Sequence, residues 1–128
     1  MKNLVAVING EAQIEYDRSK DLPVNQLEYL NKMDQKMDEG IPHGAGHLFA
    51  PDVQQKAQFV ADQLVMAIKS DNEQLIAATM AYLATRLPDL QQVSAEDINN
   101  EVSIKLIYDQ AFAKAEPVKF VRPDKLNS

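Results

Sequence analysis

The sequence feature that most constrains the fold is an Asn-Gly pair at positions 9 and 10, between two runs of β-prone residues. Both residue types tolerate a positive φ, which the two central positions of a type I′ hairpin turn require. An Asn-Gly pair in this setting is among the clearest local signals for a β-hairpin. We therefore expect the chain to begin with a hairpin over residues 3–17.

With Asn9 and Gly10 as the loop, the pairing of the two strands follows. On the more apolar face we expect the cross-strand pairs Val7–Ala12, Val5–Ile14 and Asn3–Tyr16. The other face is mixed, as in a hairpin that lies on a helical layer. An isolated two-stranded hairpin is marginal in water, so it needs helices over one face or a second copy along its edge.

Hydrophobic periodicity predicts helices over most of the remaining chain. Apolar residues recur at steps of three and four, which places them on one face of an α-helix. Pro23 suits a first helical turn, Gly40 suits a C-terminal cap, and Ser70 precedes Glu73 at the spacing of a capping box. The expected helices cover residues 23–39, 52–69, 71–87 and 95–115. The second and third are joined by a very short loop and should pack as an antiparallel hairpin.

The fourth expected helix competes with a strand. Ser94 is a plausible N-cap because acidic residues follow it in the first turn, and alanines continue the segment after residue 110. However, residues 102, 104, 106 and 108 are apolar or aromatic and alternate with more polar neighbours, which is the spacing of a strand. A helix over 95–115 is preferred, and a strand over 102–108 stays open as the alternative.

Together these patterns predict a mainly α fold of the α+β class. The N-terminal β-hairpin would pack on an antiparallel bundle of about four helices. We expect one globular domain over residues 1–116 and an extended or disordered tail over 117–128. A chain of 128 residues is of ordinary size for one domain and can bury a core without disulfides.

Composition excludes several classes of function. The chain has no cysteine, which removes disulfide scaffolds, thiolate zinc sites and cysteine nucleophiles, and which suits a reducing cytoplasm. Its formal net charge of −6 argues against nucleic acid, including DNA binding by a helix–turn–helix in the middle helices. The first apolar run is too short for a signal peptide, and no run approaches the roughly 18–20 residues of a membrane span. We expect a cytoplasmic protein outside the membrane.

The chain's two histidines, His43 and His47, lie in the glycine-rich loop 40–51 as His-Gly-Ala-Gly-His. Two imidazoles with a third or fourth ligand could hold a divalent metal. The nearest carboxylates are Asp34, Asp38 and Glu39, of which Asp38 is the predicted ligand. The signature H-E-x-x-H of zinc enzymes is absent. The alternatives are an ordinary surface loop and a purification metal held by paired histidines. No other cofactor is predicted.

A second polar cluster, Glu15-Tyr16-Asp17-Arg18, ends the predicted hairpin. Glu15 and Asp17 share a strand face and could act as paired carboxylates, although such a cluster more often fixes a strand end. No Gly-rich phosphate loop or nucleophile elbow is present.

The sequence therefore favours a small cytosolic protein-interaction or regulatory module without catalytic activity. It would act as a homodimer, with hairpin edges or apolar helix faces as the contact, and its partner would be itself or another protein. The alternative is a small metal-dependent enzyme or metal-binding protein centred on loop 40–51.

Overall fold

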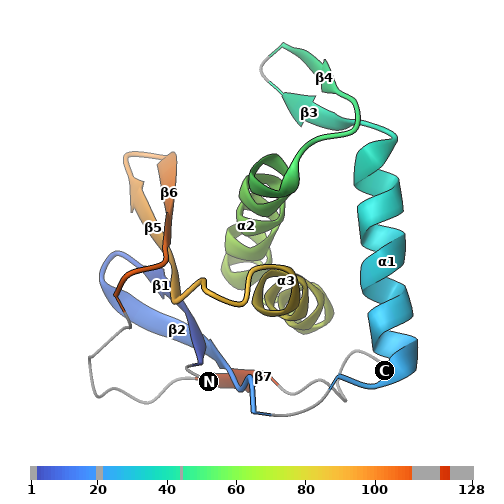
Figure 1. Cartoon of the computed structure of the whole chain (residues 1–128). Helices are drawn as coiled ribbons and strands as arrows, with labels where there is room; N and C mark the ends of the chain where they lie inside the picture. The colour runs from blue at the N-terminus through green and yellow to red at the C-terminus, as the bar shows by residue number, and fades with distance from the viewer. Residues whose placement is uncertain (1–2, 20–21, 44, 111–118, 122–128) are drawn as a thin grey trace.

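The computed structural model describes residues 3–19, 22–43, 45–110 and 119–121 (Figure 1). Within these residues the chain forms three helices and seven strands in two sheets. The main sheet has the strand order β6-β5-β1-β2-β7. Its strands are β1 (Leu4–Ile8), β2 (Glu11–Tyr16), β5 (Gln92–Ile98), β6 (Glu101–Ile107) and β7 (Lys119–Val121). The fold is of the α+β class, and the predicted bundle of about four helices is wrong.

The predicted N-terminal hairpin is present as β1 and β2, joined by the expected turn. Asn9 and Gly10 have φ values of 51° and 80°, which are the positive angles that a type I′ turn needs. Next to the turn the pairing follows the expectation, because Val7 lies opposite Ala12. The hairpin does not end the sheet. β5 pairs with β1 and β7 pairs with β2, both in parallel, so both edges of the hairpin are occupied.

A β-bulge between Ala6 and Val7 changes the register of the rest of the hairpin. Ala6 therefore lies opposite Ile14, and Leu4 lies opposite Tyr16, so two of the three predicted cross-strand pairs are wrong. The bulge places these four side chains in the hydrophobic core. A bulge adds one unpaired residue to a strand, and alternation of side chains alone does not reveal where it falls.

The three helices expected before residue 88 are present as α1 (Val24–Asp38), α2 (Val53–Lys69) and α3 (Glu73–Arg86). Their caps differ from the expectation. The first turn of α3 is capped by Asn72, whose side chain accepts a hydrogen bond from the Leu75 amide at 3.2 Å, and not by Ser70. Gly40, just after α1, has a φ of 135°, and a Cβ there would approach the Phe49 ring to 3.1 Å. This position therefore requires glycine.

The predicted fourth helix is the point at which the fold differs most from the expectation. Residues 92–107 form the antiparallel strands β5 and β6, so the strand alternative is the correct one. Asn99 and Asn100 have φ values of 54° and 65° and form the two-residue turn between them. Asparagine tolerates the left-handed conformation, which breaks a helix at this point. The final part of the predicted helix and most of the predicted tail lie outside the described residues.

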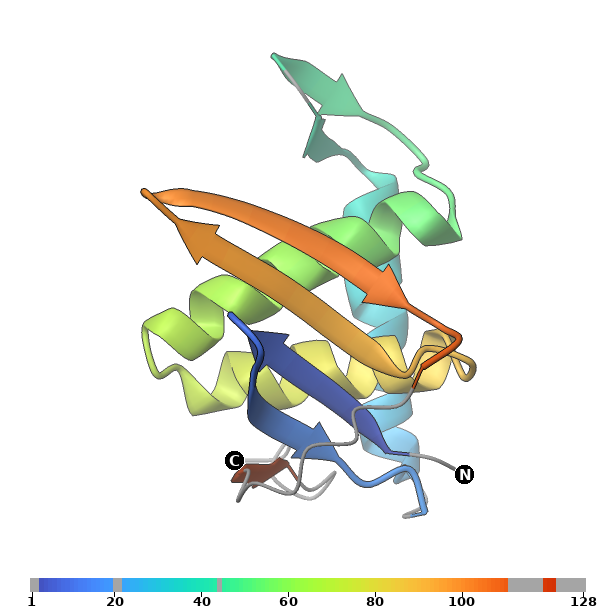
Figure 2. The same cartoon turned by 90° about the vertical axis from the view of Figure 1, so that its left-hand side faces the viewer.

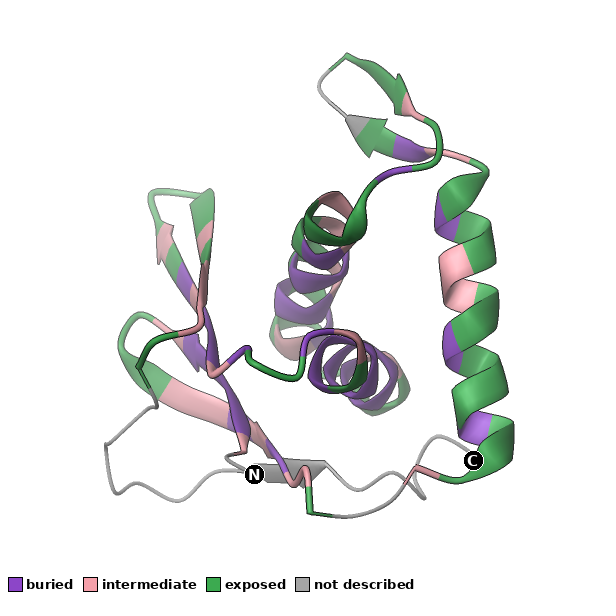
Figure 3. Cartoon of the chain, viewed as in Figure 1, coloured by how far each residue is buried: buried purple, intermediate pink, exposed green. Residues whose placement is uncertain are grey.

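The elements form three layers (Figure 1). The main sheet covers one side of the α2–α3 hairpin, and α1 lies on the other side. Figure 2 shows the long β5–β6 hairpin lying along α2, with β1 and β2 beside α3. In the middle layer, α3 is buried on every face from Ile76 to Ala84, and its exposed residues are confined to its ends (Figure 3).

A second, two-stranded sheet links α1 to α2. Loop 40–51 folds in part into β3 (Ile41–His43) and β4 (Gly46–Leu48), which project from the helical layers (Figure 1). Only Ile41 of this arm has a fully buried side chain among those described. The arm therefore lies above α2, and its other described side chains are exposed or partly exposed.

Candidate functional site

The three residues of the predicted metal site lie on the β3–β4 arm and at the end of α1. His47 lies in β4 with its side chain exposed and pairs with Pro42, whereas the backbone of His43 pairs with Gly46. The side chain of His43 lies outside the described part of the chain. Asp38 ends α1, where its carboxylate forms an ion pair with Lys56 at 2.9 Å.

No group of three or more His, Cys, Asp or Glu side chains that could hold a metal occurs among the described residues. The metal site therefore stays a prediction from sequence, and no contact in the structure supports it. Metal analysis of untagged protein, with His47→Ala alongside, tests it. If the native chain carries stoichiometric metal that the variant lacks, the loop is a metal site.

The cluster at the end of the hairpin has a structural role. Arg18 donates hydrogen bonds to the backbone carbonyls of Ala84 at 3.4 Å and Leu87 at 2.9 Å, at the C-terminal end of α3. A cation at this end of a helix satisfies free carbonyls and the helix dipole. Glu15 instead accepts a hydrogen bond from the Asn3 side chain at 3.3 Å. A paired role for the carboxylates of Glu15 and Asp17 stays a prediction from sequence.

Asp34 lies on the face of α1 that meets the other helices and has polar contacts with both of them. Its carboxylate accepts a hydrogen bond from the Tyr82 hydroxyl and one from Arg86 Nε at 3.0 Å, both on α3. Lys56 Nζ, on α2, lies 3.3 Å from Asp34 Oδ1. The Arg86 guanidinium also stacks over the Tyr82 ring, 5.9 Å from its centroid. We call these four residues, together with Asp38, the Asp34 cluster.

The shifted pKa values in the Asp34 cluster favour a charged Asp34, a charged Lys56 and a protonated Tyr82 hydroxyl. Burial alone would raise the pKa of Asp34, but the Tyr82 hydrogen bond and the charges of Lys56 and Arg86 outweigh burial and lower it. Burial would likewise lower the pKa of Lys56, but its contacts with Asp38 and Asp34 raise it. Burial and the neighbouring Asp34 carboxylate raise the pKa of Tyr82 well above its ordinary value.

The Asp34 cluster joins all three helices. Its two acids and two bases neutralise one another, and each of its polar groups has a partner within the chain. A catalytic site needs a group that faces a substrate, whereas here the ionisable groups face each other. We therefore interpret the cluster as the attachment of α1 to the middle layer.

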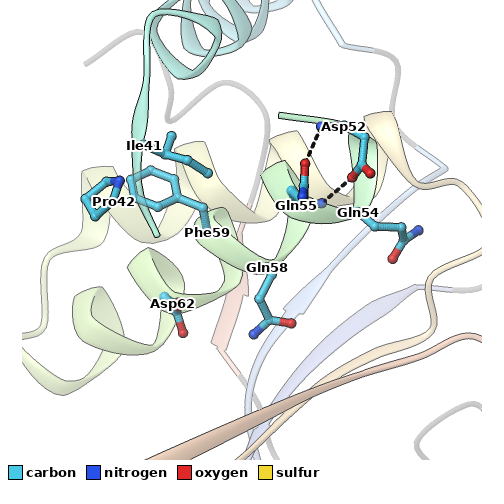
Figure 4. Close-up of a pocket in the computed structure, with 8 residues that line it drawn as sticks. All are labelled: Ile41, Pro42, Asp52, Gln54, Gln55, Gln58, Phe59 and Asp62. Atoms are coloured by element: carbon cyan, nitrogen blue, oxygen red, sulfur yellow. Dashed lines mark hydrogen bonds between the residues drawn. The ribbon is translucent and has the colours of Figure 1, made fainter. Parts of the chain in front are cut away.

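Two open hollows of the described structure lie along α2. One, of about 430 Å³, lies under the β3–β4 arm, and the other, of about 420 Å³, lies between α2 and β6. Both are lined by Pro42, Phe59 and Asp62, so we describe them together as the α2 groove. Figure 4 shows the half of the groove under the arm, where the Asp52–Gln55 capping box lies at the start of α2.

The two halves of the α2 groove differ in character. The half under the arm is rich in amides and carboxylates, with Gln54, Gln58 and Asp62 in its lining. The half beside β6 is mainly apolar, and its lining includes Val65 and Met66 of α2 with Val102 and Ile104 of β6. Met66 is 63% exposed and Val102 is 43% exposed, although both are large apolar side chains. The second half is the more suited to cover by another protein surface.

β6 ends the main sheet on the side of the α2 groove. It pairs with β5 on one side, and no described strand lies on its other side. An unpaired strand edge presents backbone N–H and C=O groups to any further strand that approaches it. Helix α2 and the open edge of β6 together form a surface that periodicity did not predict, because residues 95–115 were expected to be helical.

Comparison with models of known protein families, with curated proteins and with solved structures finds no significant match for this chain. Function must therefore be inferred from the geometry described above. No helix among the described residues combines the length and the apolar character that a membrane crossing requires.

Proposed function

We propose that this chain is a protein-interaction or regulatory module without catalytic activity, which acts as a homodimer in the cytoplasm. The observation that carries the proposal is the open edge of β6 beside the apolar half of the α2 groove. A two-fold dimer places the same surface of both copies in contact, so one edge and one groove are sufficient. The absence of cysteine suits a reducing compartment.

The dimer contact is assigned to β6 because the other edges are less available. Both edges of the β1–β2 hairpin are paired within the chain, which removes the hairpin edge proposed from the sequence. At the far end of the sheet, β7 has three residues, whereas β6 has seven. A very short edge strand is a weak template for pairing, and a long one is a good template.

Exposed apolar side chains support the same surface. Val102 and Met66 would lose their contact with water if a second copy covered the groove, and burial of apolar area stabilises by about 25 cal/mol per Å². The ionisable Asp34 cluster is occupied by contacts within the chain, which favours a role in stability over a role in catalysis.

Sedimentation velocity over a dilution series tests the homodimer. We expect a species of twice the 14.3 kDa chain mass that dissociates on dilution. A chain that stays monomeric up to about 100 μM, where even a weak dimer would register, would contradict the homodimer. In that case the charged side chains of β6 would prevent its edge from pairing with a second copy.

A further inference from the structure

We infer that two copies join edge to edge through antiparallel β6 strands, in the register centred on Ser103. This inference rests on the proposed homodimer and adds its partner surface, its register and the side chains that fix it. The contact would extend the main sheet from one copy into the other, with the two α2 grooves on the same face.

The backbone groups of β6 that face outward can be identified from the bonds of its neighbour. The Asn9 amide donates to the Ala95 carbonyl at 2.8 Å, and the Val5 amide donates to the Gln91 carbonyl at 3.2 Å. The backbone N–H and C=O groups of odd-numbered residues of β5 therefore point to β1, and those of even-numbered residues point to β6. They alternate because successive residues of a strand direct these groups to opposite sides.

The same alternation then applies to β6 itself. Ser94 and Glu96 lie opposite Lys105 and Ser103, so these odd-numbered residues of β6 exchange hydrogen bonds with β5. Val102, Ile104 and Leu106 direct their N–H and C=O groups to the open side. They are the groups that a second copy can reach.

A register centred on Ser103 pairs these outward-facing backbone groups with those of the second copy. It places Val102 of one copy opposite Ile104 of the other, in a pair that exchanges both backbone hydrogen bonds. Two-fold symmetry repeats the pair, so the contact contains two such reciprocal pairs. Ser103 then lies opposite Ser103 of the second copy, at a position without backbone hydrogen bonds, where side chains approach more closely.

The charges of β6 match in this register. Glu101 lies opposite Lys105 of the second copy, and the symmetric pair repeats the match on the same face of the sheet. Both side chains are exposed, and neither takes part in an ion pair among the described residues. Opposite charges directly across antiparallel strands are stabilising, and like charges there are destabilising.

Neighbouring registers lose this match. A centre on Ile104 places Glu101 opposite Ile107 and Lys105 opposite Ser103. A centre on Lys105 places the two lysines against each other, which is repulsive. The run Glu-Val-Ser-Ile-Lys from residue 101 to 105 is self-complementary in charge only about its middle residue.

The apolar face of β6 supports the same contact. Ile104 and Leu106 lie opposite Ala95 and Val93 of β5, which are 1% exposed and face the helices. Val102 shares this helix side and lines the α2 groove with Met66. In the proposed register Val102 lies beside Ile104 of the second copy, so the exposed apolar side chains of the two grooves cover one another.

Charge reversal tests the register. We expect Glu101→Lys and Lys105→Glu each to weaken the dimer by roughly tenfold or more, because each variant places like charges at both symmetric positions. A mixture of the two variants should form heterodimers of near-native affinity, because all facing pairs are then opposite in charge. Sedimentation velocity measures both effects. Lys32→Glu on the exposed side of α1 is the control for Lys105→Glu, since it makes the same change of net charge and leaves β6 intact.

The outcomes separate the two proposals. A monomeric native chain overturns the homodimer and the register together. If the native chain is a dimer and neither charge reversal changes its affinity, the register is overturned and the homodimer stands. The same holds if the two variants are monomeric alone and their mixture also fails to associate.

Proline substitution provides a second test that does not depend on charge. Val102→Pro should retain the fold and abolish the dimer, because the lost N–H points to the open edge, where proline is tolerated. Ser103→Pro should destabilise the fold itself, because its N–H bonds to β5. Circular dichroism and sedimentation separate the two effects. A Val102→Pro chain that is folded and still dimeric overturns the assignment of the contact to β6.

Discussion

At the scale of single residues, Asp34 joins α1 to the other two helices. It is 26% exposed, and it contacts Tyr82 and Arg86 on α3 and Lys56 on α2. The layer that it fixes, α1, buries few of its own side chains, namely Gln26, Leu30 and Met37. The attachment of α1 therefore depends on polar contacts to an unusual degree.

We expect Asp34→Asn to lower the free energy of unfolding by about 1–2 kcal/mol, because it removes a charged acceptor from partly buried partners. Asp38→Asn is the matched control, since it removes the same charge from a carboxylate that is 52% exposed. Its effect should stay within about 0.5 kcal/mol. Urea unfolding at one fixed chain concentration measures both. Equal effects of the two substitutions would contradict the role of Asp34.

The lowered pKa of Asp34 also predicts a dependence on pH. Because its folded pKa lies below the unfolded value of about 4, the carboxylate stabilises the fold above that pH. This stability is lost as the pH falls through the folded pKa. We expect the native chain to lose more stability than Asp34→Asn between about pH 5 and pH 2. Parallel acid-limb curves for the two proteins would count against this expectation.

Gln26, also on α1, predicts a gain of stability. It is 1% exposed, and neither polar atom of its side chain has a hydrogen-bond partner among the residues that the structure describes. A buried amide without partners costs about 1–3 kcal/mol, so Gln26→Met should raise the free energy of unfolding by about 1 kcal/mol. Gln35→Met, on the exposed side of the same helix, should change it little. A destabilised Gln26→Met chain would show that the amide has a partner after all.

The residues of the candidate surfaces were predictable only in part. Asp34 lies among the apolar positions of α1, but its partners Lys56 and Tyr82 are 22 and 48 residues away in sequence. Local periodicity does not show which helices meet, so the cluster could not be assembled from the sequence. His43 and His47 stood out by their type and spacing, and their role as metal ligands stays a prediction.

At the scale of elements, the signals that agreed with the structure were local ones. The Asn-Gly turn and the periodicity of the first three helices depend on neighbouring residues, and these elements are present. The β5–β6 hairpin carried two conflicting local signals, an N-cap pattern at Ser94 and the alternation of residues 102–108. The pairing of β5 with β1 favours the strand over the helix. Because β1 is distant in sequence, this pairing cannot be read from the residues around β5.

The turn of this hairpin makes a testable prediction. Asn100 has a φ of 65°, which a β-branched residue adopts only with strain. Asn100→Val should lower the free energy of unfolding by about 1–2 kcal/mol, whereas Asn100→Gly should keep or raise it. Thermal unfolding of the two variants checks the difference. If valine is tolerated as well as glycine, the turn does not have this geometry.

At the scale of the whole molecule, the order of the layers determines which surfaces stay free. The sheet and α1 cover opposite sides of the α2–α3 hairpin, and α3 is consequently buried (Figure 3). Helix α2 extends beyond this cover, beside β6 and under the β3–β4 arm. The free surface of the molecule therefore combines a strand edge with an apolar helix face, which is the pair of features that a symmetric dimer can use.

Amide hydrogen exchange, measured above and below the dissociation concentration, tests the homodimer most directly. The amides of Val102 and Ile104 face the open edge, where no described strand gives them backbone partners and where the proposed second copy would. We predict that the segment 101–107 exchanges more slowly as the chain concentration rises, while the segment 11–16 does not change. Exchange of 101–107 that is independent of concentration would contradict a homodimer formed through β6.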